Sequence, residues 1–112
     1  MKLNNLQIVN IYAILNSKCQ QLDDIKLKWK LVGLSEQVFN IYQRFETEKN
    51  DIVQKYGKED EKTGQMILNG NDKHYVDLLK CETEITPIPL EDLQGVPLSL
   101  DELMILKPII KE

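Results

Sequence analysis

The stretch LSEQVFNIYQRFETEKNDIVQKYG, residues 34–57, decides the fold of this chain. Its apolar side chains recur every three or four residues, and at the angular spacing of a helix they fall within an arc of about 120°. Ser35 is a favourable N-cap, and Gly57 is a favourable residue for ending a helix. The pattern therefore predicts a one-sided helix over residues 35–56, about 33 Å long. Its buried stripe consists of Leu34, Val38, Ile41, Tyr42, Phe45, Ile52, Val53 and Tyr56.

The segment before this helix alternates strictly between apolar and basic residues. Over residues 25–31, IKLKWKL, the apolar side chains would share one face of a strand and the lysines the other. We therefore predict a strand, with Lys26, Lys28 and Lys30 protecting its outer side against further pairing. Gly33 would separate this strand from the long helix. The alternative is a basic surface for a membrane or a nucleic acid, for which three lysines are too few.

Residues 5–19 form a third pattern, a broad apolar stripe. Asn4 or Asn5 is a suitable N-cap for a helix here. The stripe covers an arc of about 200°, so this helix is either central in the fold or meets another chain with its outer side. The stripe consists of Leu6, Val9, Ile11, Tyr12, Ala13, Leu15 and Cys19.

The second half of the chain is richer in turns. Residues 57–70 predict a mobile polar loop that contains a short strand at 66–68. A helix should follow from Asn71 or Asp72 to Glu82, then an extended segment over 83–89 and a helical turn at 90–93. Ser99 and Glu102 match the capping-box pattern S-x-x-E at the start of a last helix, which Pro108 should end.

These elements together predict a helix-dominated α+β fold. We expect a single domain over residues 1–112, with a long central helix, three further helices and a small antiparallel sheet of two or three short strands. Trp29, Tyr42, Phe45 and the first helix should share one core.

Composition bounds the function. The chain has 112 residues, of which 42% are apolar and 29% charged, as expected of one folded domain. Its net charge of -4 is uneven, because residues 46–112 hold most of the acidic side chains while residues 1–45 are basic overall. An acidic half argues against nucleic-acid binding. The longest apolar runs are too short for a membrane span, and no secretion signal opens the sequence.

Catalytic motifs are missing from the sequence. It contains none of the phosphate-binding, dinucleotide-binding, serine-hydrolase or zinc-peptidase signatures. Cys19 and Cys81 should be reduced thiols, and Cys81 and the single histidine, His74, would lie about 10 Å apart along a helix, too far to act together. We therefore predict no enzyme activity, no metal and no cofactor.

A protein partner is what the surface pattern favours. Phe39 lies just off the long helix's stripe, where it is either a core-margin residue or an exposed anchor, and the acidic half could dock on a basic partner. A basic patch for an anion is a further hypothesis. The candidate interaction residues are Lys26, Lys28, Lys30, Phe39, Arg44, Glu46, Glu48, Asp60 and Glu61.

Four segments carry a resemblance to known proteins: MKLNNLQIVNIY at the start, IKLKWKL at 25–31, IVQKYG at 52–57, and residues 78–88 followed by VPLSLDEL. In these segments the chain resembles a family of small proteins of unknown function encoded by phages and prophages of Gram-positive bacteria. The resemblance covers nearly the whole chain and implies expression in the cytoplasm of an infected bacterial host. It supplies no active-site residues.

Two functional hypotheses follow. The first is a non-enzymatic phage protein that binds a host or phage protein, inhibition of a host defence or housekeeping factor being its concrete version. The second is a phage morphogenesis or tail-module accessory protein that assembles with itself or with a virion component. Independently of both, we expect a homodimer, formed through the helix at 5–19 or the long helix, with a monomer as the alternative.

Overall fold

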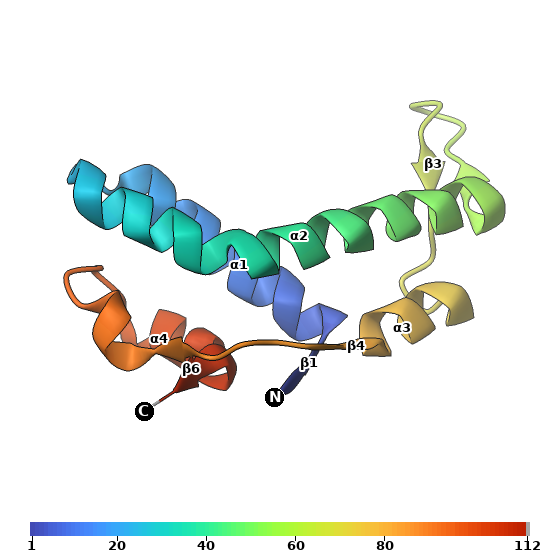
Figure 1. Ribbon diagram of the computed structural model, residues 1–112. Helices are drawn as coiled ribbons and strands as arrows, with labels where there is room; N and C mark the ends of the chain where they lie inside the picture. The colour runs from blue at the N-terminus through green and yellow to red at the C-terminus, as the bar shows by residue number, and fades with distance from the viewer. Residues whose placement is uncertain (112) are drawn as a thin grey trace.

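The protein is built around one long helix, as Figure 1 shows. The structure is a computed structural model and describes residues 1–111. The helices are α1 (Asn5–Gln21), α2 (Ile25–Tyr56), α3 (Lys73–Lys80) and α4 (Leu100–Leu106), with 3-10 turns η1 (Leu90–Leu93) and η2 (Lys107–Ile109). The predicted helix-dominated α+β fold with a long central helix and three further helices is confirmed.

The strands form three separate two-stranded sheets in place of one. β1 (Lys2–Asn4) pairs antiparallel with β4 (Glu82–Glu84), and β2 (Lys58–Glu59) pairs antiparallel with β3 (Met66–Ile67). β5 (Ile88–Pro89) pairs with β6 (Ile110–Lys111) in parallel, which the expectation of antiparallel strands did not include. With two or three residues each, β1 and β6 are too short to show a period in the sequence.

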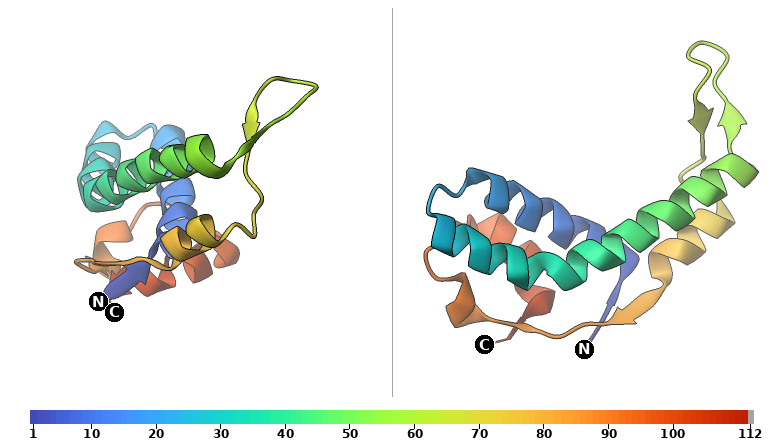
Figure 2. Two further views of the ribbon diagram at one scale, coloured as in Figure 1. Left: turned by 90° about the vertical axis from the view of Figure 1, so that its right-hand side faces the viewer. Right: turned by 45° about the horizontal axis from the view of Figure 1, so that its top comes forward.

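The core lies between the pair α1–α2 and the returning C-terminal segment. α1 packs along the N-terminal part of α2, and β5, η1, α4 and η2 close the opposite side (Figures 1 and 2). The predicted stripe of α2 is buried at Val38, Ile41 and Phe45, whereas its last member, Tyr56, is 49% exposed. The buried cluster is Leu3, Ile8, Ile11, Leu15, Leu31, Val38, Ile41, Ile85, Ile88, Leu93, Leu106 and Ile109.

The predicted strand at 25–31 is wrong, because these residues are the first two turns of α2. The alternation has another origin: Leu27 and Leu31 lie one turn apart on the inward side, while Ile25 and Trp29 lie one turn apart on the outward side. Two such pairs offset by two residues mimic the period of a strand. Trp29 is consequently 76% exposed, and its expected place in the core is also wrong.

α2 therefore begins at Ile25, ten residues before the predicted start at residue 35. Asp24 is the N-cap, with its carboxylate accepting from the backbone amides of Lys26 and Leu27. Ser35 lies inside the helix and donates its hydroxyl to the Leu31 carbonyl oxygen at 2.7 Å. Gly33 is also helical, since the intrahelical bonds on either side outweigh the cost of about 1 kcal/mol for a mid-helix glycine.

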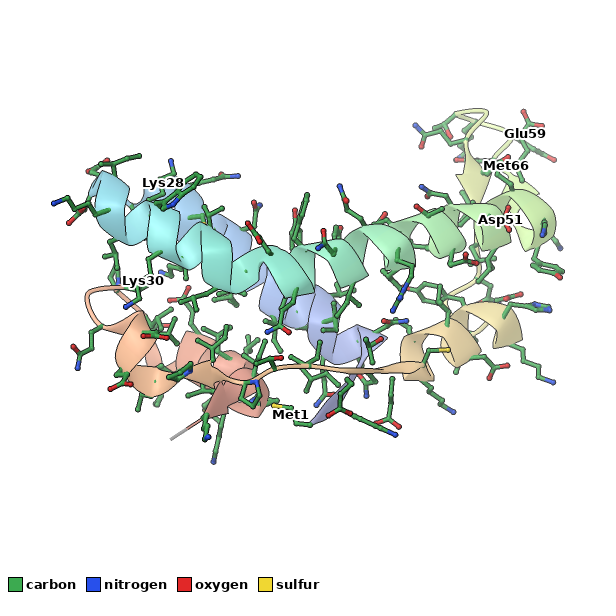
Figure 3. The ribbon with its side chains drawn as sticks, viewed as in Figure 1. Met1, Lys28, Lys30, Asp51, Glu59 and Met66 are labelled. Carbon is green, nitrogen blue, oxygen red and sulfur yellow. The ribbon has the colours of Figure 1, made fainter. Side chains whose placement is uncertain are left out.

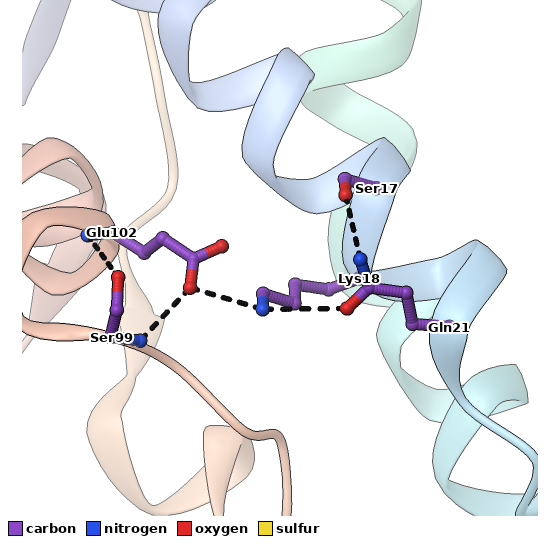
Figure 4. A network of polar contacts seen from close by, with 5 residues as sticks. All are labelled: Ser17, Lys18, Gln21, Ser99 and Glu102. Carbon is purple, nitrogen blue, oxygen red and sulfur yellow. Dashed lines mark hydrogen bonds and ion pairs between the residues drawn. The ribbon is translucent and has the colours of Figure 1, made fainter.

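Polar anchors join α1 to the second half of the chain. At its start, Asn4 forms a capping box with Gln7, and the buried Asn5 donates its side-chain amide to the Leu78 carbonyl oxygen at 2.7 Å. At its end, Lys18 lies 3.0 Å from a carboxylate oxygen of Glu102 (Figure 4).

The caps of the later helices are as predicted. Asp72 caps α3, and Ser99 forms the capping box of α4 with Glu102, so the same carboxylate orders the start of α4 and pairs with α1. The helical turn expected at 90–93 is η1, and Pro108 lies in the 3-10 turn that ends α4.

The segment expected as a polar loop at 57–70 holds the hairpin β2–β3, which projects from the end of α2 (Figure 2). The short strand predicted at 66–68 is confirmed at Met66 and Ile67. Asp60 closes the tip, because its carboxylate accepts from the Lys62 amide and the Thr63 hydroxyl.

Candidate protein-interaction surface

The outward side of α2 carries a second apolar stripe, which we call the outer face. It consists of Ile25, Trp29, Val32, Glu36 and Phe39, spaced four, three, four and three residues apart. This spacing places all five side chains within an arc of about 80°, on the side of the helix away from the core. Ile25 is 71% exposed, Val32 37% and Phe39 41%. A row of exposed large apolar side chains on one helix face, here interrupted by Glu36, marks a site of association more often than single exposed leucines do.

A hollow of about 230 Å³ between α1 and α2 adjoins the outer face. Val32, Glu36 and Phe39 belong to both, so the hollow opens onto the stripe. Its lining is Tyr12, Leu15, Asn16, Cys19, Val32, Ser35, Glu36, Val38 and Phe39.

Stacked aromatic rings stiffen the boundary of this hollow. Tyr12 stacks on Tyr42 with ring centroids 3.9 Å apart and planes 9° apart, and Phe39 lies 6.0 Å from Tyr12. Burial, followed by the hydrogen bond and charge of Glu46, raises the pKa of the Tyr42 hydroxyl above its usual range. Packed rings of this type lose little conformational freedom when a partner covers them.

The one thiol in the hollow is not activated. Burial raises the pKa of Cys19, and the opposing effects of the Ser35 hydrogen bond and the Lys28 charge are smaller. A nucleophilic cysteine needs the reverse, a thiolate stabilised near neutral pH. Because most of its lining is apolar, the hollow is suited to binding an apolar side chain.

The helical conformation of residues 25–31 separates the three candidate lysines. Lys30 points toward η1 and lies 3.3 Å from a carboxylate oxygen of Asp92, and Lys26 is on the same side of α2. Lys28 lies on the other side, at the edge of the outer face; Figure 3 labels Lys28 and Lys30. The single basic surface expected from a strand is therefore absent from residues 25–31.

Three other candidate residues lie along the C-terminal part of α2. Arg44 donates a hydrogen bond to the Thr83 hydroxyl at 3.2 Å, and Arg44 and Glu48 line a separate hollow against α3 and β4. Glu46 lies 4.0 Å from the Lys49 ammonium.

The last two candidates, Asp60 and Glu61, are at the hairpin tip, where Asp60 has the structural role described above. The nine candidates therefore do not form one surface. Phe39 and Lys28 alone among them lie on or beside the outer face.

Sequence reasoning missed Ile25, Trp29 and Val32 as surface residues. The signal that identifies them is the pair of one-turn spacings hidden in the alternating segment.

A second exposed apolar surface involves α4, and the sequence did not indicate it either. Leu100 is 73% exposed and Met104 64%. Leu103 of the same helix faces Leu90 and Val96 across a hollow of about 400 Å³.

No protein-family profile, curated protein or solved structure matches the chain. Within residues 1–111, no helix is both long and apolar enough to cross a membrane. Over the same residues, no cluster of three or more His, Cys, Asp or Glu side chains is arranged to hold a metal ion.

Proposed function

We infer that this chain acts by binding another protein, without catalysing a reaction, and that the outer face of α2 is its binding surface. The observation that carries this proposal is the exposure of Ile25, Trp29, Val32 and Phe39 on one face of α2, beside the hollow between α1 and α2. Covering such a stripe with protein removes apolar surface from water, which is favourable by about 25 cal/mol per Å². The resemblance to phage proteins makes a host or phage protein the partner to test first, with inhibition of a host factor as the effect.

The test compares two matched pairs of substitutions with the unsubstituted chain. Trp29→Ser with Val32→Ser alters the outer face, and Leu100→Ser with Met104→Ser makes the same kind of change on α4. Each form is used to capture partners from a lysate of Gram-positive bacteria, with sedimentation in parallel to measure its own mass. All four side chains are exposed, so thermal unfolding should be nearly unchanged.

The expected result is a saturable protein partner, or a second copy of the chain, that is lost with the outer-face variant and kept with the α4 variant. Equal binding by both variants would contradict the assignment to the outer face. A single-chain mass together with no saturable partner would overturn the proposed function as a whole.

A second candidate function is that of a phage morphogenesis or tail-module accessory protein, which assembles with itself or with a virion component. The spacing of four, three, four and three residues on the outer face favours it, because this is the spacing by which paired helices interlock.

A further inference from the structure

We propose that a second copy of this chain packs antiparallel against the outer face of α2, on a two-fold axis that passes beside Val32. This inference rests on the proposed function, since it names the occupant of the same surface. It is carried by the position of two charges, one within the outer face and one at its edge.

Those charges are Lys28 and Glu36, each four residues from Val32. Both border or occupy the outer face, and neither has an oppositely charged partner within residues 1–111. By contrast, Lys30 on the inward side has Asp92, and Lys55 further along the helix has Asp51. A lone acid in the middle of an apolar stripe disfavours covering by an apolar helix, unless the covering surface brings a cation to it.

A second copy brings that cation when its α2 runs antiparallel. With the two-fold axis beside Val32, residues at equal distances from Val32 in the two chains lie at the same height. Lys28 of one copy then faces Glu36 of the other, and the symmetry repeats this pair on the other side of the axis. A parallel arrangement would set Lys28 against Lys28 and Glu36 against Glu36, which like-charge repulsion disfavours.

The same register matches the apolar residues. Ile25 of one copy lies at the height of Phe39 of the other, and the two Val32 side chains meet at the axis. Trp29 lies at the height of Ser35, which lines the adjoining hollow beside the outer face. The matched segment, residues 25–39, is about 21 Å long. It adjoins the hollow between α1 and α2 in both copies.

Space on the outer face is open to such a partner. α1 borders this side of α2 at Phe39, which lies against Tyr12, whereas Ile25 and Trp29 stay 71% and 76% exposed. A contact confined to one helix face is small beside the roughly 1,200–2,000 Å² that stable interfaces bury. The dimer should therefore dissociate over an accessible range of concentration.

The first experiment is a charge exchange read by sedimentation equilibrium. Glu36→Lys places like charges opposite each other twice, and it should raise the dimer dissociation constant by about tenfold or more. Lys28→Glu should do the same. The double exchange, Lys28→Glu with Glu36→Lys, restores both pairs and should return the constant to near that of the unsubstituted chain. Glu61→Lys at the hairpin tip makes the same change in charge and should have no effect.

The second experiment traps the axis. In a chain with Cys19→Ser and Cys81→Ser, Val32→Cys should oxidise to a covalent dimer, because the two side chains meet at the axis. Gln43→Cys lies on the same side of α2 but eleven residues away, so its two copies would be about 33 Å apart. A disulfide needs Cβ atoms about 4 Å apart, and this control should therefore stay uncrosslinked.

Three outcomes would overturn the inference. One is a single-chain mass at all concentrations up to about 1 mM. Another is a dimer that is unaffected by Glu36→Lys, and the third is a dimer whose double exchange is no better than either single change. If the chain is monomeric yet captures a different protein through the outer face, the inference fails and the proposed function stands. If it dimerises only through α4, both fail.

Discussion

The two apolar stripes of α2 differ in what covers them. The inward stripe is closed over by α1 and the C-terminal segment, and Leu31 within it is 1% exposed. The outer face lies on the same helix. Its residue Val32, which directly follows Leu31, is 37% exposed. Hydropathy alone does not separate the two, because both are built from large apolar side chains. The difference teaches that burial within this chain depends on how much surface its remaining elements can cover.

The largest expected effect is a difference in stability between substitutions at Leu31, on the inward stripe, and at Val32, on the outer face. Leu31→Ala should lower the free energy of unfolding by about 2–5 kcal/mol, because it leaves a cavity in the core. Val32→Ala, one position later, should change it by no more than about 0.5 kcal/mol. Urea denaturation at a protein concentration below that of association measures both. Equal losses would mean that Val32 is covered within a single chain.

Loss of the buried hydrogen bond between Asn5 of α1 and the Leu78 carbonyl oxygen should give the next largest effect. Asn5 is buried and donates to the Leu78 carbonyl oxygen, so Asn5→Ala leaves that acceptor without its partner. The expected loss is about 1–3 kcal/mol in the free energy of unfolding. Asn10→Ala, an exposed position on the same helix, is the control and should be close to neutral. Alanine has the higher helix propensity, so any propensity effect at Asn10 would be stabilising, and a loss at Asn10 as large as that at Asn5 would show that the hydrogen bond is not the source of the difference.

Gly33 tests the comparison at a position of α2 that no other part of the described chain covers. An added Cβ there would meet nothing within 4 Å, and the residue is inside α2. Gly33→Ala should therefore stabilise the fold by about 0.5–1 kcal/mol, through a lower backbone entropy in the unfolded chain. The same urea measurement applies. A destabilisation would favour the non-helical conformation that the alternating sequence first suggests.

The smallest effect is a dependence on pH. Hydrogen bonding from the Ser99 amide, followed by Lys18, holds the pKa of Glu102 below its usual range. A lowered pKa in the folded state stabilises the fold above the usual glutamate pKa of about 4.3, and this stabilisation is lost as the pH falls through the folded value.

Glu102→Gln should therefore have a lower melting temperature than the unsubstituted chain at pH 7, with the difference shrinking in acid. Glu61→Gln at the hairpin tip is the matched control, because Glu61 is exposed, and its melting temperature should differ little from that of the unsubstituted chain at either pH. A difference for Glu102→Gln that persists unchanged at pH 3 would show that the carboxylate charge is not its source.

How far the sequence predicts the structure depends on the range of the interactions. Local signals were sufficient for the caps at Asn4, Asp72 and Ser99 and for the inward stripe of α2. The alternating segment misled because a two-sided helix and a one-sided strand produce the same pattern over seven residues. Lysine and leucine favour a helix intrinsically, and the capping signal at Asp24 was the local feature that could have decided.

The candidate surface was less predictable than the fold. Phe39 could be identified because it stands just outside a clean stripe, whereas Trp29 was placed in the core on the strength of the strand. The exposure of the outer face depends on where α1 stops covering α2, which is a long-range outcome with no local signal. The parallel pairing of β5 with β6 is unpredictable for the same reason.

The pairing of β1 with β4 has a consequence for how the chain folds during synthesis. Asn4 lies opposite Glu82, and the amide of Asn5 donates to the Cys81 carbonyl oxygen. The first residues therefore cannot form these contacts until the ribosome has synthesised about eighty further residues. At translation rates of 5–20 residues per second, this interval is about 4–16 s. During that time α1 and α2 can pack together as a helical hairpin. The side of their core that the C-terminal segment covers in the complete fold is still exposed. A nascent chain stalled before residue 80 should therefore be sensitive to proteases, and one extended past β6 should resist them.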